Sequence, residues 1–292
     1  MHVLVTGASG FSGAVISAEL LARGFIVTAV TGKNKNRLPI NSEFNKSLNI
    51  ISTDISQGFE IPEGINSIIH VAARSPWIGV SVADMVRDNV IATQNLISSA
   101  VKNGVSKFIY FSSLSVHGNI EVEVVDQKTP ILDPGVYGLT KRLCEQMLQA
   151  AAGPAMSCMA MRLPGIIGPS SVRNWLSTTY EKAKRGEDIF VYDKKAMFNN
   201  AVHINDLAAF VGNLLTLSWT GYDFGPLGAS EQIKAGEVAQ ILSDAGGGKS
   251  AIYEDNSPKR SYTISSDWAQ RHYGYSPMGT EKMIRQFCLE NS

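Results

Sequence analysis

The chain has 292 residues, of which 44% are hydrophobic, and its 26 Lys and Arg balance its 26 Asp and Glu to give a formal net charge of zero. This length allows one large domain or a core with a smaller lobe, and the hydrophobic content is ample for a buried core. The charge balance argues against nucleic acid or an anionic membrane as the main partner.

The cysteines and histidines form no metal-binding pattern. The three cysteines, Cys144, Cys158 and Cys288, lie far apart in an odd number that fits a reducing compartment, and the five histidines are scattered. Met1 is followed at once by a strand pattern, which leaves no room for a signal peptide, and no apolar run is long enough to span a bilayer. We therefore expect a cytoplasmic protein with no metal and no membrane partner.

A glycine-rich segment, TGASGFSG at residues 6–13, follows an apolar strand pattern at 2–6 and overlaps the start of a helical pattern at 10–23. In such a turn the backbone N–H groups can approach a pyrophosphate, and the helix N-terminus adds a partial positive charge. The strand–turn–helix context predicts a dinucleotide-binding turn at Gly7, Gly10 and Gly13.

Short apolar runs and helical patterns then alternate through the first 165 residues. This alternation is typical of a parallel sheet with right-handed crossovers. With the glycine turn it predicts an α/β, doubly wound (Rossmann) fold. The expected strands are 2–6, 25–31, 48–53, 67–72, 106–112 and 156–162, and the expected helices are 10–23, 81–103 and 136–152.

Two polar segments lie where chemistry is expected in this fold. The apolar strand at 106–112 ends in Ser112 and Ser113, at the carboxyl edge that faces the ligand crevice of a doubly wound sheet. Tyr137 and Lys141 are four residues apart and share one face of the expected helix 136–152. An ammonium group close to a phenol lowers the phenol's pKa, so this pair could serve as acid and base in carbonyl–alcohol chemistry.

The alternation loosens after Pro164. The sequence there predicts a helix at 173–186, a strand at 189–192, a helix at 205–217 and a flexible glycine run at 246–248. We expect an NAD(P)-binding Rossmann domain over 1–165, to which the segment 202–220 returns. The segments 166–201 and 221–292 then form a smaller C-terminal substrate-binding lobe.

These motifs occur in a fixed order, and the ordered set resembles the extended short-chain dehydrogenases/reductases, the branch of sugar-nucleotide epimerases, dehydratases and reductases. The segments that carry the resemblance are 6–13, Asp54, 70–73, 89–90, 112–118, 137–141, 162–169 and 202–207.

The resemblance implies roles for individual residues. Tyr137 would exchange a proton with the sugar oxygen, Lys141 would bind the nicotinamide ribose and lower the tyrosine pKa, and Ser113 would orient the substrate oxygen. The implied cofactor contacts are Gly7, Ser9, Gly10, Phe11, Gly13, Thr31, Lys33, Asp54, Ile55, Val71, Ala72, Ala73, Asn89, Tyr137, Lys141, Pro164 and Ile166, and the implied substrate contacts are Ser113, Arg173, Asn174 and Asn199.

The chain departs from the family pattern at three places. Leu114 and Ser115 replace the acidic pair of the dehydratases, and neither can perform the acid–base steps of water elimination. His117 replaces a common tyrosine, either as an extra acid or as a packed aromatic ring. The stretch 198–201 lacks the arginine that grips the substrate diphosphate in many relatives, and Arg173 could replace it or lie in solvent.

The second strand ends in Thr31, without the carboxylate usual at NAD-specific sites, and Lys33 follows. This favours NADP over NAD. We expect an oxidoreductase or epimerase that acts on a nucleotide sugar, as a 4-epimerase or a 4-keto reductase. The alternatives are an NADPH-dependent reductase of a non-nucleotide carbonyl and a non-catalytic NADP-binding protein.

Apolar residues on two of the expected helices also suggest self-association. Val86, Val90, Ile97 and Val101 lie on 81–103, and Leu143, Met147 and Ala151 lie on 136–152. The family commonly pairs these helices across a two-fold axis, so the resemblance implies a homodimer. Alternatively, all of these residues pack on the sheet.

Overall fold

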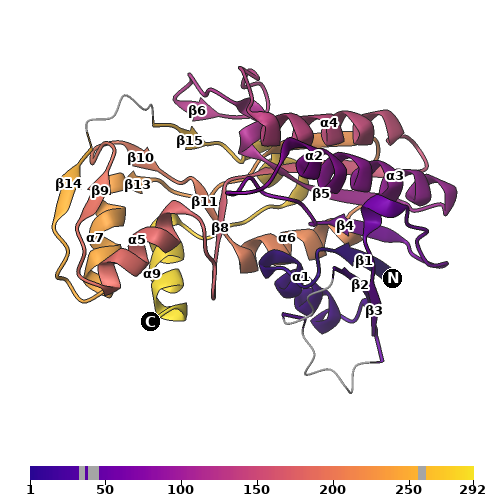
Figure 1. The fold of residues 1–292 in the computed structure, drawn as a ribbon, viewed down its shortest axis with the longest axis horizontal. Coiled ribbons are helices and arrows are strands. Elements are labelled where there is room, and N and C mark those ends of the chain that lie inside the picture. The colour runs from indigo at the N-terminus through magenta and orange to yellow at the C-terminus, as the bar shows by residue number, and fades with distance from the viewer. Residues whose placement is uncertain (33–36, 39–45, 256–260) are drawn as a thin grey trace. The chain divides into compact units, whose positions relative to one another are not determined.

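A computed structural model describes residues 1–292 except 33–36, 39–45 and 256–260 (Figure 1). The chain divides into two compact units. The first contains Met1–Asn119, Ile131–Arg162 and Ala208–Gly225, and the second contains Ile120–Pro130, Leu163–Leu207 and Pro226–Ser292. The expected division placed 120–130, 163–165 and 202–207 in the Rossmann domain and 221–225 in the lobe, whereas these segments fall in the other unit here.

A seven-stranded sheet in the order β12-β7-β5-β4-β1-β2-β3 forms the centre of the first unit. The registered pairs β1–β2, β1–β4, β2–β3 and β4–β5 are all parallel. The strands are β1 (His2–Thr6), β2 (Ile26–Thr31), β3 (Leu48–Ser52), β4 (Ser67–His70), β5 (Lys107–Ser113), β7 (Ser157–Leu163) and β12 (Tyr222–Pro226). The predicted fold class is confirmed.

Helices cover both faces of this sheet. Figure 1 shows α1 (Phe11–Ala22) on one face, and α3 (Ala92–Lys102) and α4 (Val136–Ala151) on the other. The apolar face of α3 and α4 packs on β4, β5 and β7 through buried residues such as Leu96, Leu148 and Phe108. The expected helix 81–103 is interrupted, because a π-helical turn, η3 (Val86–Ile91), separates α2 (Val82–Met85) from α3.

Two 3₁₀ turns lie at the carboxyl edge of the sheet. They are η2 (Ile55–Gln57), which follows β3, and η4 (Leu114–His117), which follows β5. The six strands and three helices expected in the first 165 residues are all present, with ends that differ by a few residues. The seventh strand, β12, was not predicted.

The second unit contains short strand pairs and helices. The pairs are β8 (Gly165–Ile167) with β11 (Ala201–His203), β9 (Ile189–Val191) with β14 (Ile252–Glu254), β10 (Met197–Phe198) with β13 (Ile233–Lys234), and β6 (Val124–Val125) with β15 (Thr263–Ile264). The helices are α5 (Trp175–Lys184), α7 (Ala235–Ala245), α8 (Asp267–Tyr273) and α9 (Thr280–Glu290).

A separate apolar core holds this unit together, with Leu176, Tyr180, Leu242, Ile284 and Phe287 among its buried members. Helix α6 (Ile204–Thr216) begins in the second unit and continues in the first. Among the described residues, no helix combines the length and the apolar character that crossing a bilayer requires.

Candidate active site

The glycine turn between β1 and α1 has no room for larger residues. Gly7 has φ +66°, and a Cβ built on it would lie 2.8 Å from the backbone nitrogen of Ala72. A Cβ on Gly13 would lie 2.2 Å from the carbonyl oxygen of Gly7. Glycine is therefore required at both positions, because the turn brings backbone close to backbone. This cradle fits the pyrophosphate of a dinucleotide.

A pocket of about 960 Å³ opens at this turn. Ten of the predicted cofactor contacts line it: Gly7, Ser9, Gly10, Phe11, Gly13, Asp54, Ile55, Val71, Ala72 and Ala73. They follow the carboxyl ends of β1, β3 and β4, which lie at one edge of the parallel sheet, where β4 is next to β1 and β2 separates β1 from β3. The structure thus gathers residues that are distant in sequence into one pocket.

Asp54 offers a charged carboxylate in this pocket. It caps η2, and its Oδ1 accepts hydrogen bonds from the backbone nitrogen of Ser56 at 3.0 Å and from its hydroxyl at 2.7 Å. These hydrogen bonds hold the pKa of Asp54 below its ordinary value. The carboxylate is therefore ionised at neutral pH and can accept a hydrogen bond from an amino group.

The end of β2 differs from the expectation. Thr31 is buried and does not line the pocket, whereas the next residue, Gly32, does. Among the described residues, the Thr31 hydroxyl has no hydrogen-bond partner. Lys33, the expected basic contact, lies outside the described residues.

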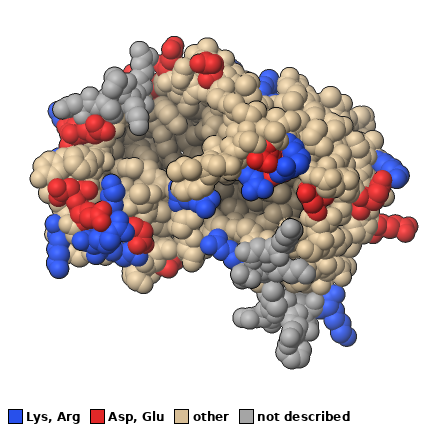
Figure 2. Space-filling view, in the orientation of Figure 1, with Lys and Arg blue, Asp and Glu red and all other residues tan. Residues whose placement is uncertain are grey.

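A charged cluster in the pocket lining was not predicted from the sequence. Arg74 pairs with Asp88 at 2.6 Å, and Arg87 pairs with the same carboxylate at 2.7 Å. No sequence motif indicates this cluster, because the spacing between these residues is not typical of any kind of site. Side chains of both signs also lie beside one another elsewhere on the face shown in Figure 2.

Asn89 lies in the π-helical turn η3 and connects three segments. Its Oδ1 accepts from the backbone nitrogen of Arg74 at 2.6 Å, and its Nδ2 donates to the Arg74 carbonyl and to the Thr140 hydroxyl, both at 3.1 Å. Thr140 in turn donates to the Tyr137 carbonyl at 2.8 Å. Asn89 does not line the pocket; it braces the loop after β4 against the start of α4.

Tyr137 and Lys141 share the inward face of α4, as their spacing predicted. The Lys141 ammonium lies 5.9 Å from the centre of the Tyr137 ring and donates to the Phe111 carbonyl at 2.7 Å. Burial lowers the pKa of Lys141 to about 8. The pKa of Tyr137 is not lowered as expected, because burial raises it to about 12 and outweighs a hydrogen bond with Ser75.

Ser113 lies at the end of β5, beside the start of α4. Its hydroxyl accepts from the Ser115 backbone nitrogen and donates to the Ser115 hydroxyl, both at 3.1 Å. A Cβ built on Gly138 would lie 2.0 Å from the Ser115 carbonyl oxygen, so the turn after Ser113 touches the residue after Tyr137. The structure therefore brings the three predicted catalytic residues to one region of the first unit.

His117 is a packed residue, which decides between the two interpretations of this position. It is fully buried at the end of η4, and its Nε2 lies 3.3 Å from the Nη1 of Arg162. Because a guanidinium only donates, His117 accepts at Nε2 and carries its proton on Nδ1. Arg162 also forms a buried ion pair with Glu145, which was not predicted from the sequence.

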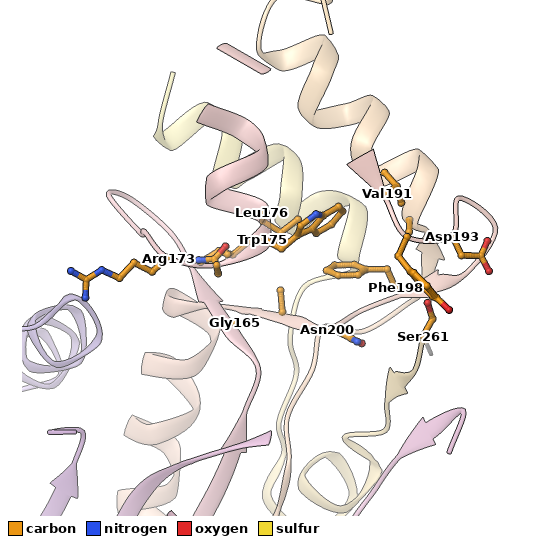
Figure 3. Close-up of a pocket in the computed structure, with 14 residues that line it drawn as sticks. Gly165, Arg173, Trp175, Leu176, Val191, Asp193, Phe198, Asn200 and Ser261 are labelled. Carbon is orange, nitrogen blue, oxygen red and sulfur yellow. The ribbon is translucent and has the colours of Figure 1, made fainter. Parts of the chain in front are cut away.

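A second pocket, of about 500 Å³, lies within the second unit (Figure 3). Trp175 and Phe198 line it with their ring centres 5.5 Å apart. Asn174 caps α5 by accepting from the Ser177 backbone nitrogen, and it also lines the pocket. Asn200 contributes a buried Oδ1 that has no hydrogen-bond partner among the described residues.

The remaining predicted residues of the second unit have different environments. Asn199 does not line this pocket; its side-chain amide bonds the backbone of Ala229 and Ile264. Arg173 lines the pocket, but Figure 3 shows its side chain extending away from the other labelled residues. Pro164 and Ile166 also lie in the second unit.

Comparison with known proteins agrees with this geometry. A sequence model of the NAD dependent epimerase/dehydratase family matches residues 3–219. The chain belongs to this family. It is therefore an enzyme of an NAD(P)-dependent family whose members include nucleotide-sugar epimerases and dehydratases.

Two relatives that match nearly the whole chain are named for different classes of substrate. The 3β-hydroxysteroid dehydrogenase/Δ5→4-isomerase of Mycobacterium tuberculosis is 26% identical over 99% of this chain and 82% of its own. The dTDP-glucose 4,6-dehydratase of Streptomyces griseus is 24% identical over 94% of this chain and 89% of its own. The solved structure of MoeE5 with UDP-glucuronic acid and NAD shares the fold, with a TM-score of 0.80, 24% identity, and coverage of 100% of this chain and 97% of that one.

Proposed function

We propose that this enzyme transfers hydride to and from a nucleotide sugar, as a 4-epimerase or a 4-keto reductase. The observation that carries the proposal is the second pocket, in which Trp175 and Phe198 flank polar groups from Asn174 and Asn200. Aromatic rings stack on a planar base, and amide groups can hydrogen-bond its edge. The nucleotide of the substrate would bind there.

The reacting groups come from α4 and β5 of the first unit. When bound, the nicotinamide supplies or accepts the hydride. Tyr137, with a pKa of about 12, is protonated at neutral pH and can donate its proton to a carbonyl oxygen. The positive charge of Lys141 stabilises the phenolate that remains, and the Ser113 hydroxyl orients the substrate oxygen.

For the cofactor we propose NADP rather than NAD. The end of β2, with buried Thr31 and pocket-lining Gly32, offers no carboxylate to a ribose diol. Asp54 would accept from the adenine amino group, and the glycine turn would hold the pyrophosphate. Arg74 and Arg87 add positive charge to the same lining.

Calorimetric titration with UDP, GDP and dTDP tests the nucleotide assignment. We expect one of the three to bind the wild type, and Phe198→Ala to weaken that binding by about tenfold through loss of ring stacking. Phe190→Ala is the matched control, because Phe190 is an exposed aromatic residue of the same unit that does not line the pocket. If none of the three binds at millimolar concentration, the nucleotide-sugar proposal fails.

One observation favours a second candidate, reduction of a non-nucleotide carbonyl. The Arg173 side chain extends away from the other labelled pocket residues, which does not support the diphosphate contact expected of it. Asn199 forms hydrogen bonds with the backbone, which does not support its expected contact with the substrate. A steroid dehydrogenase is also among the relatives that match nearly the whole chain. Turnover of a steroid ketone together with no nucleotide binding would favour this candidate.

A further inference from the structure

A fully buried ion pair joins helix α4 to strand β7 in the first unit. Glu145 and Arg162 meet in two hydrogen bonds, Nε to Oε1 at 3.0 Å and Nη2 to Oε2 at 2.8 Å. The guanidinium of Arg162 also lies 4.5 Å from the centre of the Phe224 ring. Burying two charges costs free energy that their attraction only partly returns, so apolar residues would hold these elements together as well.

The same pair holds the chain on both sides of Ser113. Before it, the Ser112 hydroxyl donates to Glu145 Oε1 at 2.6 Å. After it, Arg162 Nη1 donates to Nε2 of His117, the last residue of η4, at 3.3 Å. Ser113 thus lies between two segments that are fixed to one ion pair.

The helix that carries Glu145 also carries the other two catalytic candidates. Lys141 lies one turn before Glu145 on the same inward face and donates to the Phe111 carbonyl on β5. Two successive inward residues of α4 therefore bind two successive residues, Phe111 and Ser112, at the end of β5. Such paired contacts fix the rotation and the height of the helix relative to the strand.

We propose that the Glu145–Arg162 pair is a positioning device that sets Ser113 in register with Tyr137 and Lys141. The inference rests on the proposed hydride-transfer site. Catalysis of this kind depends on geometry held to a fraction of an ångström. Charge-assisted hydrogen bonds are directional, so they fix the relative positions of the groups more precisely than apolar packing does. Glu145 and Arg162 need not touch the substrate in this role.

Two single hydrogen-bond deletions at Glu145 test the proposal. Ser112→Ala removes the bond to β5 and leaves the carboxylate paired with Arg162, so the variant should fold. Arg142→Ala removes the 3.1 Å bond from a half-buried arginine on α4 itself, which holds no part of β5. We expect kcat to fall about ten- to hundredfold in Ser112→Ala, with the KM of the cofactor unchanged, and to stay within twofold of wild type in Arg142→Ala.

Ser112→Thr keeps the hydroxyl and should restore most of the kcat. Equal kcat values for Ser112→Ala and Arg142→Ala, or a Ser112→Ala variant that loses thermal stability but no kcat, would overturn the proposal. Tyr137→Phe, assayed in parallel, separates the two failures. If Tyr137→Phe retains activity, the proposed hydride-transfer site is refuted. If Tyr137→Phe loses activity and Ser112→Ala does not, the positioning role is refuted.

A pH profile gives a second readout, because Glu145 also acts on the charge of Lys141. The titratable or charged groups around Lys141 are His70 on β4, Tyr110 on β5, and Tyr137, Cys144 and Glu145 on α4. The negative charge of Glu145 raises the pKa of Lys141, so Glu145→Gln should shift the alkaline limb of kcat/KM to lower pH. An unchanged limb in a folded Glu145→Gln variant contradicts the proposal, and if that variant does not fold, the Ser112 series decides.

Discussion

Gly138 and Ser115 touch backbone to backbone: a Cβ built on Gly138 would lie 2.0 Å from the Ser115 carbonyl oxygen. This contact joins the first turn of α4, which carries Tyr137, to the turn after Ser113. Gly138→Ala should push these segments apart and lower kcat by tenfold or more, with a fall in melting temperature. Gly135→Ala is the matched control, because a Cβ there meets nothing within 4 Å. Wild-type kcat in Gly138→Ala would show that the contact does not set the site.

Tyr137→Phe should keep the fold and the cofactor affinity but lose about 10²–10⁴-fold in kcat, the usual contribution of a positioned acid–base group. Fluorescence titration with the dinucleotide checks binding, and circular dichroism checks the fold. Tyr253→Phe serves as the control, because Tyr253 is an exposed tyrosine of the second unit that lines neither pocket. Activity above about a tenth of wild type in Tyr137→Phe would remove Tyr137 from the mechanism.

Cofactor choice should respond to a change at Gly32. The pocket lining includes Gly32 and not Thr31, and a Cβ at Gly32 meets nothing within 4 Å, so a side chain fits there. Gly32→Asp should shift the preference toward NAD, because a carboxylate accepts from the ribose diol and repels a 2′-phosphate. Gly32→Asn controls for size without charge. Tighter binding of NAD than of NADP by the wild type would contradict the proposed cofactor.

His70 should make the protein less stable in acid. The Thr93 hydroxyl donates its hydrogen bond to the Asn89 carbonyl, so it accepts one from His70 Nε2 at 2.9 Å. The other ring nitrogen of His70, Nδ1, then accepts from the Thr6 hydroxyl at 2.6 Å. Burial first, and then the charge of Lys141, lower the pKa of His70 from its ordinary value of 6.5 to about 3.

Between those two pKa values the unfolded chain binds a proton at His70 that the folded protein does not. The free energy of unfolding therefore falls as the pH drops through this window, by up to ~1.4 kcal/mol per pH unit from this residue. Urea denaturation at several pH values should give a shallower slope for His70→Gln than for wild type. His272→Gln, at an exposed histidine, should leave the slope unchanged. Equal slopes for all three proteins would contradict the assignment.

The predicted homodimer depends on apolar side chains that the sheet leaves uncovered. Val101 is 58% exposed and Leu143 is 49% exposed, whereas Val90 and Ile97 are buried on the sheet. Leu139 lies one turn before Leu143 on α4 and is 53% exposed. We expect light scattering at micromolar concentration to give a dimer for wild type and a monomer for Leu139→Glu/Leu143→Glu. Leu289→Glu, at an exposed leucine of α9, should remain dimeric; a monomeric wild type would refute the prediction.

Much of the fold could be predicted because its signals are local. The alternation of strand and helix patterns located β1 to β5 and α1 to α4, since periods of 2 and 3.6 residues depend only on neighbours in the chain. The interruption of the helix at η3 was not predicted, because Asn89 makes its side-chain contacts with Arg74 and Thr140, which are distant in sequence. The two-residue strand β6 carries too short a pattern to detect.

The sequence by itself determined the Rossmann fold, the glycine turn and the four-residue spacing that puts Tyr137 and Lys141 on one helical face. Only the tertiary structure decided the environment of each side chain. It buried Thr31 and left Gly32 in the pocket, it raised the pKa of Tyr137 through burial, and it paired Glu145 with Arg162, 17 residues further along the chain. Local periodicity fixes which way a residue faces on its own element, but desolvation and pairing depend on the elements that pack against it.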